Sequence, residues 1–262
     1  MPQFVHDGLS FNYRIIGEGF PFFLLHGLGN NNLQTQDMYH PVDGIMCVLP
    51  DQRGHGESES DDDMSIDTLV EDVIKLADHL GIDRFAIGGI SMGAAVSIAT
   101  CLKHPERIAG MLLIRNAWCD RTMSQIYVDL FAALAEALKK NDRDALLNSP
   151  AYQTALKEDS KTAVSMFDFF EDPVALKYPG KFAAVPEQHP IRTLDELRKI
   201  QVPVMILANR QDDIHPYHYG EILHEAIEYS QFHEIACKKE NKEQYDSDIN
   251  RYLRVLLAEI ER

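Results

Sequence analysis

The stretch Gly89-Ile90-Ser91-Met92-Gly93 decides how this chain folds. It matches the pattern G-x-S-x-G and lies between two apolar runs. Residues 84–88 predict a buried strand and residues 94–99 predict a helix. A serine on a sharp turn from strand to helix exposes its hydroxyl at a helix N-terminus, which favours negative charge. The flanking glycines leave room for the tight backbone, so Ser91 is predicted to be a nucleophile rather than a plain turn residue.

The composition predicts one globular α/β domain with an insertion. The chain has 262 residues, of which 45% are hydrophobic and 25% charged, and its formal net charge is -16. A strongly acidic surface repels nucleic acid and anionic membranes, so we expect neither as a partner. The expected partner is a small molecule, and the oligomeric state is left open.

The cysteines indicate a reducing compartment. Cys47, Cys101, Cys119 and Cys237 are scattered without C-x-x-C spacing, which favours free thiols over disulfides or a zinc site. The N-terminus has neither a basic start nor an apolar run, so we expect no signal peptide and a cytoplasmic location. No nucleotide loop, metal-ligand cluster or flavin motif is visible, and no cofactor or metal is implied.

Apolar runs separated by helical patterns organise the rest of the chain. Strands are predicted at residues 11–16, 21–25, 45–49, 108–114, 202–208 and 232–236, and helices at 65–80 and 245–260. The unbroken runs at 21–25 and 45–49 are typical of strands buried on both faces, as in a parallel sheet. Residues 121–190 form a helical insertion, which we expect at the carboxyl edge of the sheet where ligands bind.

Three motifs in this order resemble the α/β-hydrolase family. His26-Gly27-Leu28-Gly29 follows the strand at 21–25, residues 51–58 (DQRGHGES) follow the strand at 45–49, and the Ser91 motif follows the next strand. The resemblance implies a mostly parallel central sheet flanked by helices, within a single domain spanning residues 1–262. It also implies that residues 121–190 form a helical cap over the active site.

The resemblance also implies an oxyanion hole made by the backbone amides of Leu28 and Met92. Preorganised N–H donors there would stabilise the negative charge that acyl transfer places on a carbonyl oxygen. Because backbone amides stabilise the charge, the two side chains are free and are expected to line an apolar pocket; ordinary packing is the alternative. His26 is expected to hold its loop, and direct contact with the substrate is the alternative.

The family's catalytic acid maps onto Asp212, in the loop after the strand at 202–208. The pattern is an acid, any residue, an aliphatic residue, any residue and proline, which fits Asp212 to Pro216. Asp213 stands where a proline is common, so the assignment could shift by one residue. The alternative acid is therefore Asp213.

The general base is missing from its usual place, because residues 237–243 contain no histidine. A serine hydroxyl is a weak nucleophile unless a base takes its proton. The candidates are His215, three residues after Asp212, and His233, which falls within the last predicted strand. The alternative for His215 is a loop or helix-start residue without a catalytic role. His189 is a remote option. Two further histidines are expected on a solvent-facing helix face: His218 and His224.

Arg115 and Trp118 follow the strand at 108–114 and are candidate substrate-binding residues. Arg115 could bind a substrate carboxylate or carbonyl, and the alternative is a salt bridge to one of the many acids. Trp118, the single tryptophan, is predicted to be a pocket wall or core residue. The cap residues expected to face the pocket or to hold the cap together are Ile126, Leu130, Phe131, Leu134, Met166, Phe167 and Phe170.

These observations favour a serine hydrolase acting on a small ester, thioester or related acyl compound. Two alternatives follow from the absent histidine. One is a ligand-binding or signalling protein that keeps the pocket without hydrolysis. The other is a cofactor-free lyase that uses Arg115 and the oxyanion donors without covalent catalysis.

Overall fold

The computed structural model describes residues 2–260 and places an eight-stranded sheet at the centre of the molecule. The strand order is β1-β2-β4-β3-β5-β6-β7-β8; β1–β2 and β2–β4 are antiparallel and the other pairs are parallel. This arrangement confirms the predicted mostly parallel α/β fold. The strands are β1 (Gln3–His6), β2 (Leu9–Ile16), β3 (Phe20–Leu25), β4 (Ile45–Pro50), β5 (Phe85–Ile90), β6 (Ile108–Ile114), β7 (Val204–Ala208) and β8 (Ser230–Glu234).

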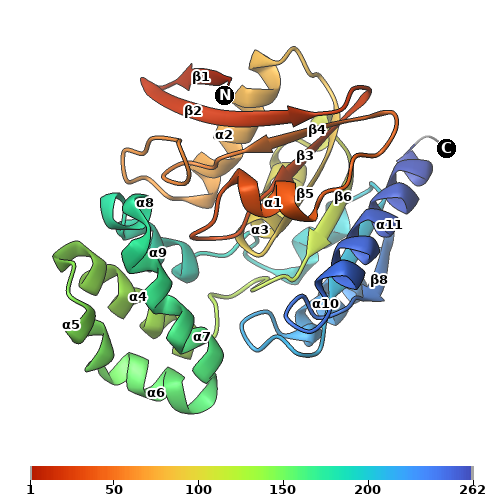
Figure 1. The fold of residues 1–262 in the computed structure, drawn as a ribbon. Helices are drawn as coiled ribbons and strands as arrows, with labels where there is room; N and C mark the ends of the chain where they lie inside the picture. The colour runs from red at the N-terminus through yellow and green to blue at the C-terminus, as the bar shows by residue number, and fades with distance from the viewer. Residues whose placement is uncertain (1, 261–262) are drawn as a thin grey trace.

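Helices cover both faces of the sheet (Figure 1). The apolar side chains of α2 (Ile66–His79), α3 (Met92–Lys103) and α10 (Tyr217–Ala226) join one core cluster. Those of α1 (Asn32–Met38) and α11 (Lys242–Ile260) join a second cluster on the opposite face. The central strands β3, β5, β6 and β7 are almost fully buried between these layers, which explains their unbroken apolar sequences.

The connection between β6 and β7 is mainly helical. In Figure 1 its helices, drawn in green, gather to one side of the sheet. Its α-helices are α4 (Gln125–Lys140), α5 (Arg143–Leu147), α6 (Pro150–Glu158), α7 (Ser160–Ser165), α8 (Pro173–Lys177) and α9 (Gly180–Ala184). Between residues 2 and 260, no helix has the length and apolar character needed to cross a membrane.

The strand register brings the chemically important loops to one edge of the sheet. Ile90 at the end of β5 pairs with Ile114 at the end of β6, which in turn pairs with Leu207 in β7. Ser91 and Arg115 come directly after Ile90 and Ile114. Because the strands are parallel, the loops that follow them lie together at the carboxyl edge.

Candidate active site

Ser91 occupies a strained turn between β5 and α3. Its φ of 54° and ψ of -111° lie outside the regions that L-residues prefer, and its amide donates to Ile114 O at 3.1 Å. A Cβ added at Gly89 would lie 2.5 Å from the Gly93 carbonyl carbon, and one at Gly93 would lie 2.4 Å from Leu25 O. The two glycines are therefore required sterically, and Ser91 is held at the start of α3.

The loop after β3 lies against Ser91. A Cβ added at Gly27 would be 3.7 Å from the Ser91 Cβ, and the Gly27 amide donates to Gln34 Oε1 of α1 at 2.9 Å. The Leu28 amide has no acceptor within residues 2–260. Met92 is the first residue of α3, where an amide has no intrahelical acceptor. Both amides are thus available to a ligand.

Only one of these two side chains lines the cavity as expected. Leu28 lines the cavity beside Ser91, as expected. Met92 does not: its side chain is fully buried in the core, because the first turn of α3 packs against the sheet. The prediction that Met92 lines an apolar pocket is therefore wrong, and only its amide faces the turn.

His26 holds its loop instead of contacting the cavity. It is fully buried; its Nδ1 donates to Gly27 O at 2.8 Å, and its Nε2 accepts from the Gln52 amide at 2.9 Å. Burial lowers the pKa of His26 to about 4, which keeps the ring neutral and suited to both bonds. The expected loop-holding role of His26 therefore agrees with the structure, and the alternative, His26 as a substrate-binding residue, is wrong because the ring does not line the Ser91 cavity.

Asp212 and His215 form a buried pair in the loop after β7. His215 Nδ1 lies 2.9 Å from Asp212 Oδ1, and the two side chains are 9% and 8% exposed. Burial alone would raise the pKa of Asp212, but His215 and then Arg115 hold it well below its usual range. Asp213 is exposed and forms no hydrogen bond with His215 or Arg115. Of the two acids, the geometry joins Asp212 to a histidine.

Arg115 contacts both members of this pair. Its Nε donates to Asp212 Oδ2 at 2.5 Å, and its Nη2 lies 3.1 Å from His215 Nδ1. The salt-bridge alternative considered for Arg115 is therefore the one the structure contains. Its side chain also lines the cavity beside Ser91, as His215 does.

The other candidate histidines lie elsewhere. His233 is in β8, where its ring stacks on Tyr252 with centroids 4.1 Å apart, and it does not line the Ser91 cavity. The β8 backbone carries its side chain to the α11 face, so its candidacy as the base is wrong. His218 and His224 are exposed on α10, as expected.

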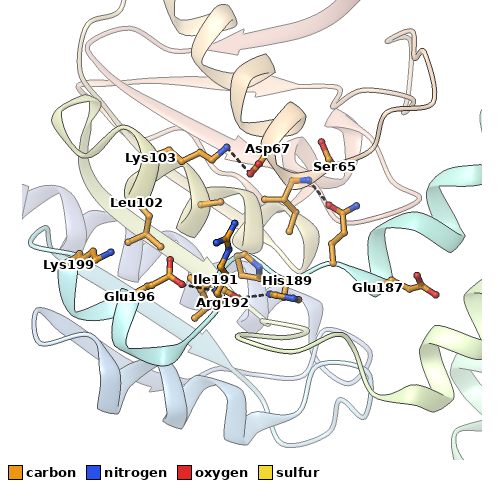
Figure 2. A pocket seen from close by; sticks show the side chains of 14 residues that line it. Ser65, Asp67, Leu102, Lys103, Glu187, His189, Ile191, Arg192, Glu196 and Lys199 are labelled. Atoms are coloured by element: carbon orange, nitrogen blue, oxygen red, sulfur yellow. Dashed lines mark hydrogen bonds and ion pairs between the residues drawn. The ribbon is translucent and has the colours of Figure 1, made fainter.

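His189 belongs to a second cavity. Figure 2 shows it beside Ile191 and Arg192, with its Nδ1 bonded to Ile191 O. This cavity, about 550 Å³, lies between the start of α2, the end of α3 and the chain that follows α9. Because Ser91 is not among its lining residues, the remote option of His189 as the base is also wrong.

The cavity beside Ser91 has a volume of about 470 Å³ and mixed walls. Trp118 forms part of one wall and is almost fully buried. Of the apolar residues of the helical connection expected at the pocket, Phe131 and Met166 line it. The others pack in the core, in agreement with the alternative that they hold this segment together. The residues that line this cavity without having been anticipated include Gln34, Thr162, Asp168, Phe169, Asp172 and Lys239.

Two contacts hold the helical connection against the loops that follow β3 and β4. A Cβ added at Gly29 would lie 2.4 Å from Phe169 Cε1, so the aromatic ring rests directly on the loop after β3. Lys181 of α9 is 2% exposed and donates to Gly54 O at 2.7 Å. Neither contact has a local sequence signal, since each joins residues more than a hundred positions apart.

No group in residues 2–260 contains three or more histidine, cysteine, aspartate or glutamate side chains placed to hold a metal ion. At the cavity, the chain's own groups include the Ser91 hydroxyl, the His215 imidazole held by the Asp212 carboxylate, and the Leu28 and Met92 amides.

Comparison with known proteins agrees with this description. A family model described as the alpha/beta hydrolase fold matches residues 21–240. The chain belongs to the α/β-hydrolase fold family.

Individual relatives are distant. A probable proline iminopeptidase from Leptolyngbya boryana is 27% identical over 254 residues, covering 81% of this chain and 78% of its own. A 3-oxoadipate enol-lactonase from Acinetobacter baylyi is 27% identical over 200 residues, covering 72% and 69%. Among solved structures, an esterase from Exiguobacterium antarcticum superposes with a TM-score of 0.74 at 21% identity, covering 95% and 97%, which supports the fold.

Proposed function

We propose that this protein is a serine hydrolase that cleaves small esters, thioesters or related acyl compounds. One observation carries the proposal: Ser91, on its strained turn, lines the same cavity as His215, which Asp212 holds. The relatives named as an iminopeptidase and an enol-lactonase are hydrolases, which supports the general class. A cavity of about 470 Å³ suits a small substrate.

In the proposed reaction, Ser91 Oγ attacks the substrate carbonyl carbon while His215 Nε2 takes the hydroxyl proton. The Leu28 and Met92 amides stabilise the oxyanion of the tetrahedral intermediate. Asp212 stabilises the imidazolium that forms. His215 then gives its proton to the leaving group, and water, deprotonated by His215, releases the acyl group from Ser91.

His215 thereby replaces the histidine that residues 237–243 lack. Its Nδ1 faces Asp212, and its Nε2 has no hydrogen-bond partner within residues 2–260. No hydrogen bond joins Ser91 Oγ to His215 in the described structure either. In enzymes without substrate, catalytic hydrogen bonds are often long and shorten only in the reactive complex.

We also propose a cytoplasmic protein whose partner is a small molecule rather than nucleic acid or membrane. The four cysteines are free thiols, which supports a reducing compartment. The net charge of -16 supports the exclusion of polyanionic partners.

The test compares steady-state hydrolysis of 4-nitrophenyl butyrate by the wild type and three variants. Ser91→Ala and His215→Gln should each lower kcat by about 10³-fold or more, since members of such a unit act together. His233→Gln is the matched control and should keep wild-type kcat. Equal activity of His215→Gln and the wild type would contradict the role of His215. Absence of hydrolysis with ligand binding retained would favour the non-hydrolytic alternative.

A further inference from the structure

Arg115 is held in place by its backbone and its guanidinium together. It follows β6 directly with a φ of 51°, a left-handed conformation that costs energy in a residue other than glycine. Its amide donates to Leu207 O of β7 at 2.7 Å. This turn points the guanidinium at the loop after β7, where it meets Asp212 and His215.

The three side chains form a closed triangle. Asp212 gives one oxygen to Arg115 Nε at 2.5 Å and the other to His215 Nδ1 at 2.9 Å, while Arg115 Nη2 lies 3.1 Å from the same Nδ1. A neutral imidazole nitrogen either donates or accepts, so Nδ1 can hydrogen-bond to only one of its two neighbours.

The shorter contact, to a carboxylate, selects the form of His215 in which Nδ1 carries the proton. In that form Nε2 keeps its lone pair, as a base for Ser91 requires. The alternative form, with Nδ1 accepting from Arg115, would set a lone pair against the Asp212 carboxylate at 2.9 Å. Arg115 Nη2 then acts on His215 as a nearby positive charge and not as a hydrogen-bond donor.

Burial and two positive charges oppose the protonation of His215, and one carboxylate favours it. Burial lowers the pKa of His215 most, and Arg115 and, more weakly, Lys239 lower it further, whereas Asp212 raises it. Tyr245 of α11, which is almost fully buried, also lies close to Arg115. Residues on the loops after β6, β7 and β8 therefore set the protonation of one imidazole.

We propose that Arg115 is a positioning residue instead of a substrate-binding one: it braces Asp212, which holds the His215 proton on Nδ1, and its positive charge keeps His215 neutral. The catalytic consequence rests on the proposed function: a base that is neutral in mildly acidic solution keeps the enzyme active there. The protonation state itself does not depend on turnover.

The test is an NMR titration of protein labelled with ¹⁵N-histidine. Two-bond ¹H–¹⁵N spectra distinguish the two neutral imidazole forms, and the spectrum of His215→Gln identifies His215 among the eleven histidines. In the wild type, His215 should titrate below 6.5, the ordinary value, and carry its neutral-form proton on Nδ1. In Arg115→Met, the pKa should rise by about one unit, because a like charge next to the ring is gone.

Two further variants distinguish the loss of the Arg115 charge from a general disturbance of the structure by mutation. Arg115→Lys keeps the positive charge and should leave the pKa of His215 below 6.5. Arg210→Met is the matched control, since Arg210 lies on the same loop as Asp212 but pairs with exposed Glu234; it should change nothing. In kinetics, the acidic limb of the kcat/KM profile for 4-nitrophenyl butyrate should move upward by about one pH unit in Arg115→Met alone.

An unchanged His215 pKa in Arg115→Met would overturn the proposal. If that variant does not fold, the wild-type spectra still decide: a neutral-form proton on Nε2, or a pKa above 6.5, contradicts it. The titration needs no turnover, so it determines the role of Arg115 even in a protein that hydrolyses none of the esters tested.

Discussion

Replacing Lys181 by methionine should change how the stability of this protein depends on pH. Lys181 is 2% exposed, and its ammonium donates to Gly54 O at 2.7 Å without a salt bridge to any carboxylate in residues 2–260. Burial lowers its pKa to about 8, although Asp172 opposes the shift. At neutral pH the folded protein therefore holds a buried charge at a cost in free energy.

The size of that cost follows from the pKa. A value of about 8 in place of 10.5 is a shift of about 2.5 units, which corresponds to about 3 kcal/mol near pH 7. Because the folded pKa lies below the unfolded one, the cost is fully present below pH 8 and is relieved as the pH rises toward 10.5. Near pH 9.5 about 1 kcal/mol remains.

The assay is urea unfolding of the wild type and Lys181→Met at pH 7 and pH 9.5. The free energy of unfolding of the wild type, relative to the variant, should rise by about 2 kcal/mol between the two pH values. Other titrating groups are common to both proteins and cancel in this difference. Lys177→Met, at an exposed position on α8, is the control and should show no such change. Parallel pH dependence of the wild type and Lys181→Met would refute the reasoning.

Three other predictions follow from the site. Asp212→Asn should lower kcat for ester hydrolysis by about 10³-fold or more, whereas Asp213→Asn should keep most of it, because Asp212, unlike Asp213, contacts His215. The pKa of Asp212 is lowered by folding, so the wild type should be more stable than Asp212→Asn at pH 7, and this advantage, measured by urea unfolding, should shrink as the pH falls below 3.8. Gly29→Ala, with φ at +73° and Phe169 in the way, should destabilise the protein by about 1–3 kcal/mol in the same assay; an unchanged midpoint would contradict the contact.

The central strands could be predicted from the sequence because burial on both faces leaves an unbroken apolar run. Such runs predict β3 and β6. β1 was not anticipated, since it has only four residues and exposes two of them. β8 begins two residues before its predicted start, because it is a half-buried edge strand whose polar residues carry no clear signal.

The sequence likewise predicts some residues of the candidate site and not others. The position of Ser91 follows from a local motif, because a strained turn requires glycines at fixed spacing. The pairing of Asp212 with His215 was only one possibility in the sequence, since the loop conformation decides whether residues three apart meet. The engagement of Arg115 joins residues almost a hundred positions apart and depends on how β6 and β7 are paired.

The most direct test of the central claim is mass spectrometry of the protein after treatment with a fluorophosphonate, a reagent that phosphonylates activated serines. The proposed function predicts a single adduct on Ser91, formed rapidly by the wild type and His233→Gln. Labelling of His215→Gln should be slower by orders of magnitude, since an unassisted serine hydroxyl is a weak nucleophile. An adduct on another serine with Ser91 unmodified, or equally fast labelling of His215→Gln, would contradict it.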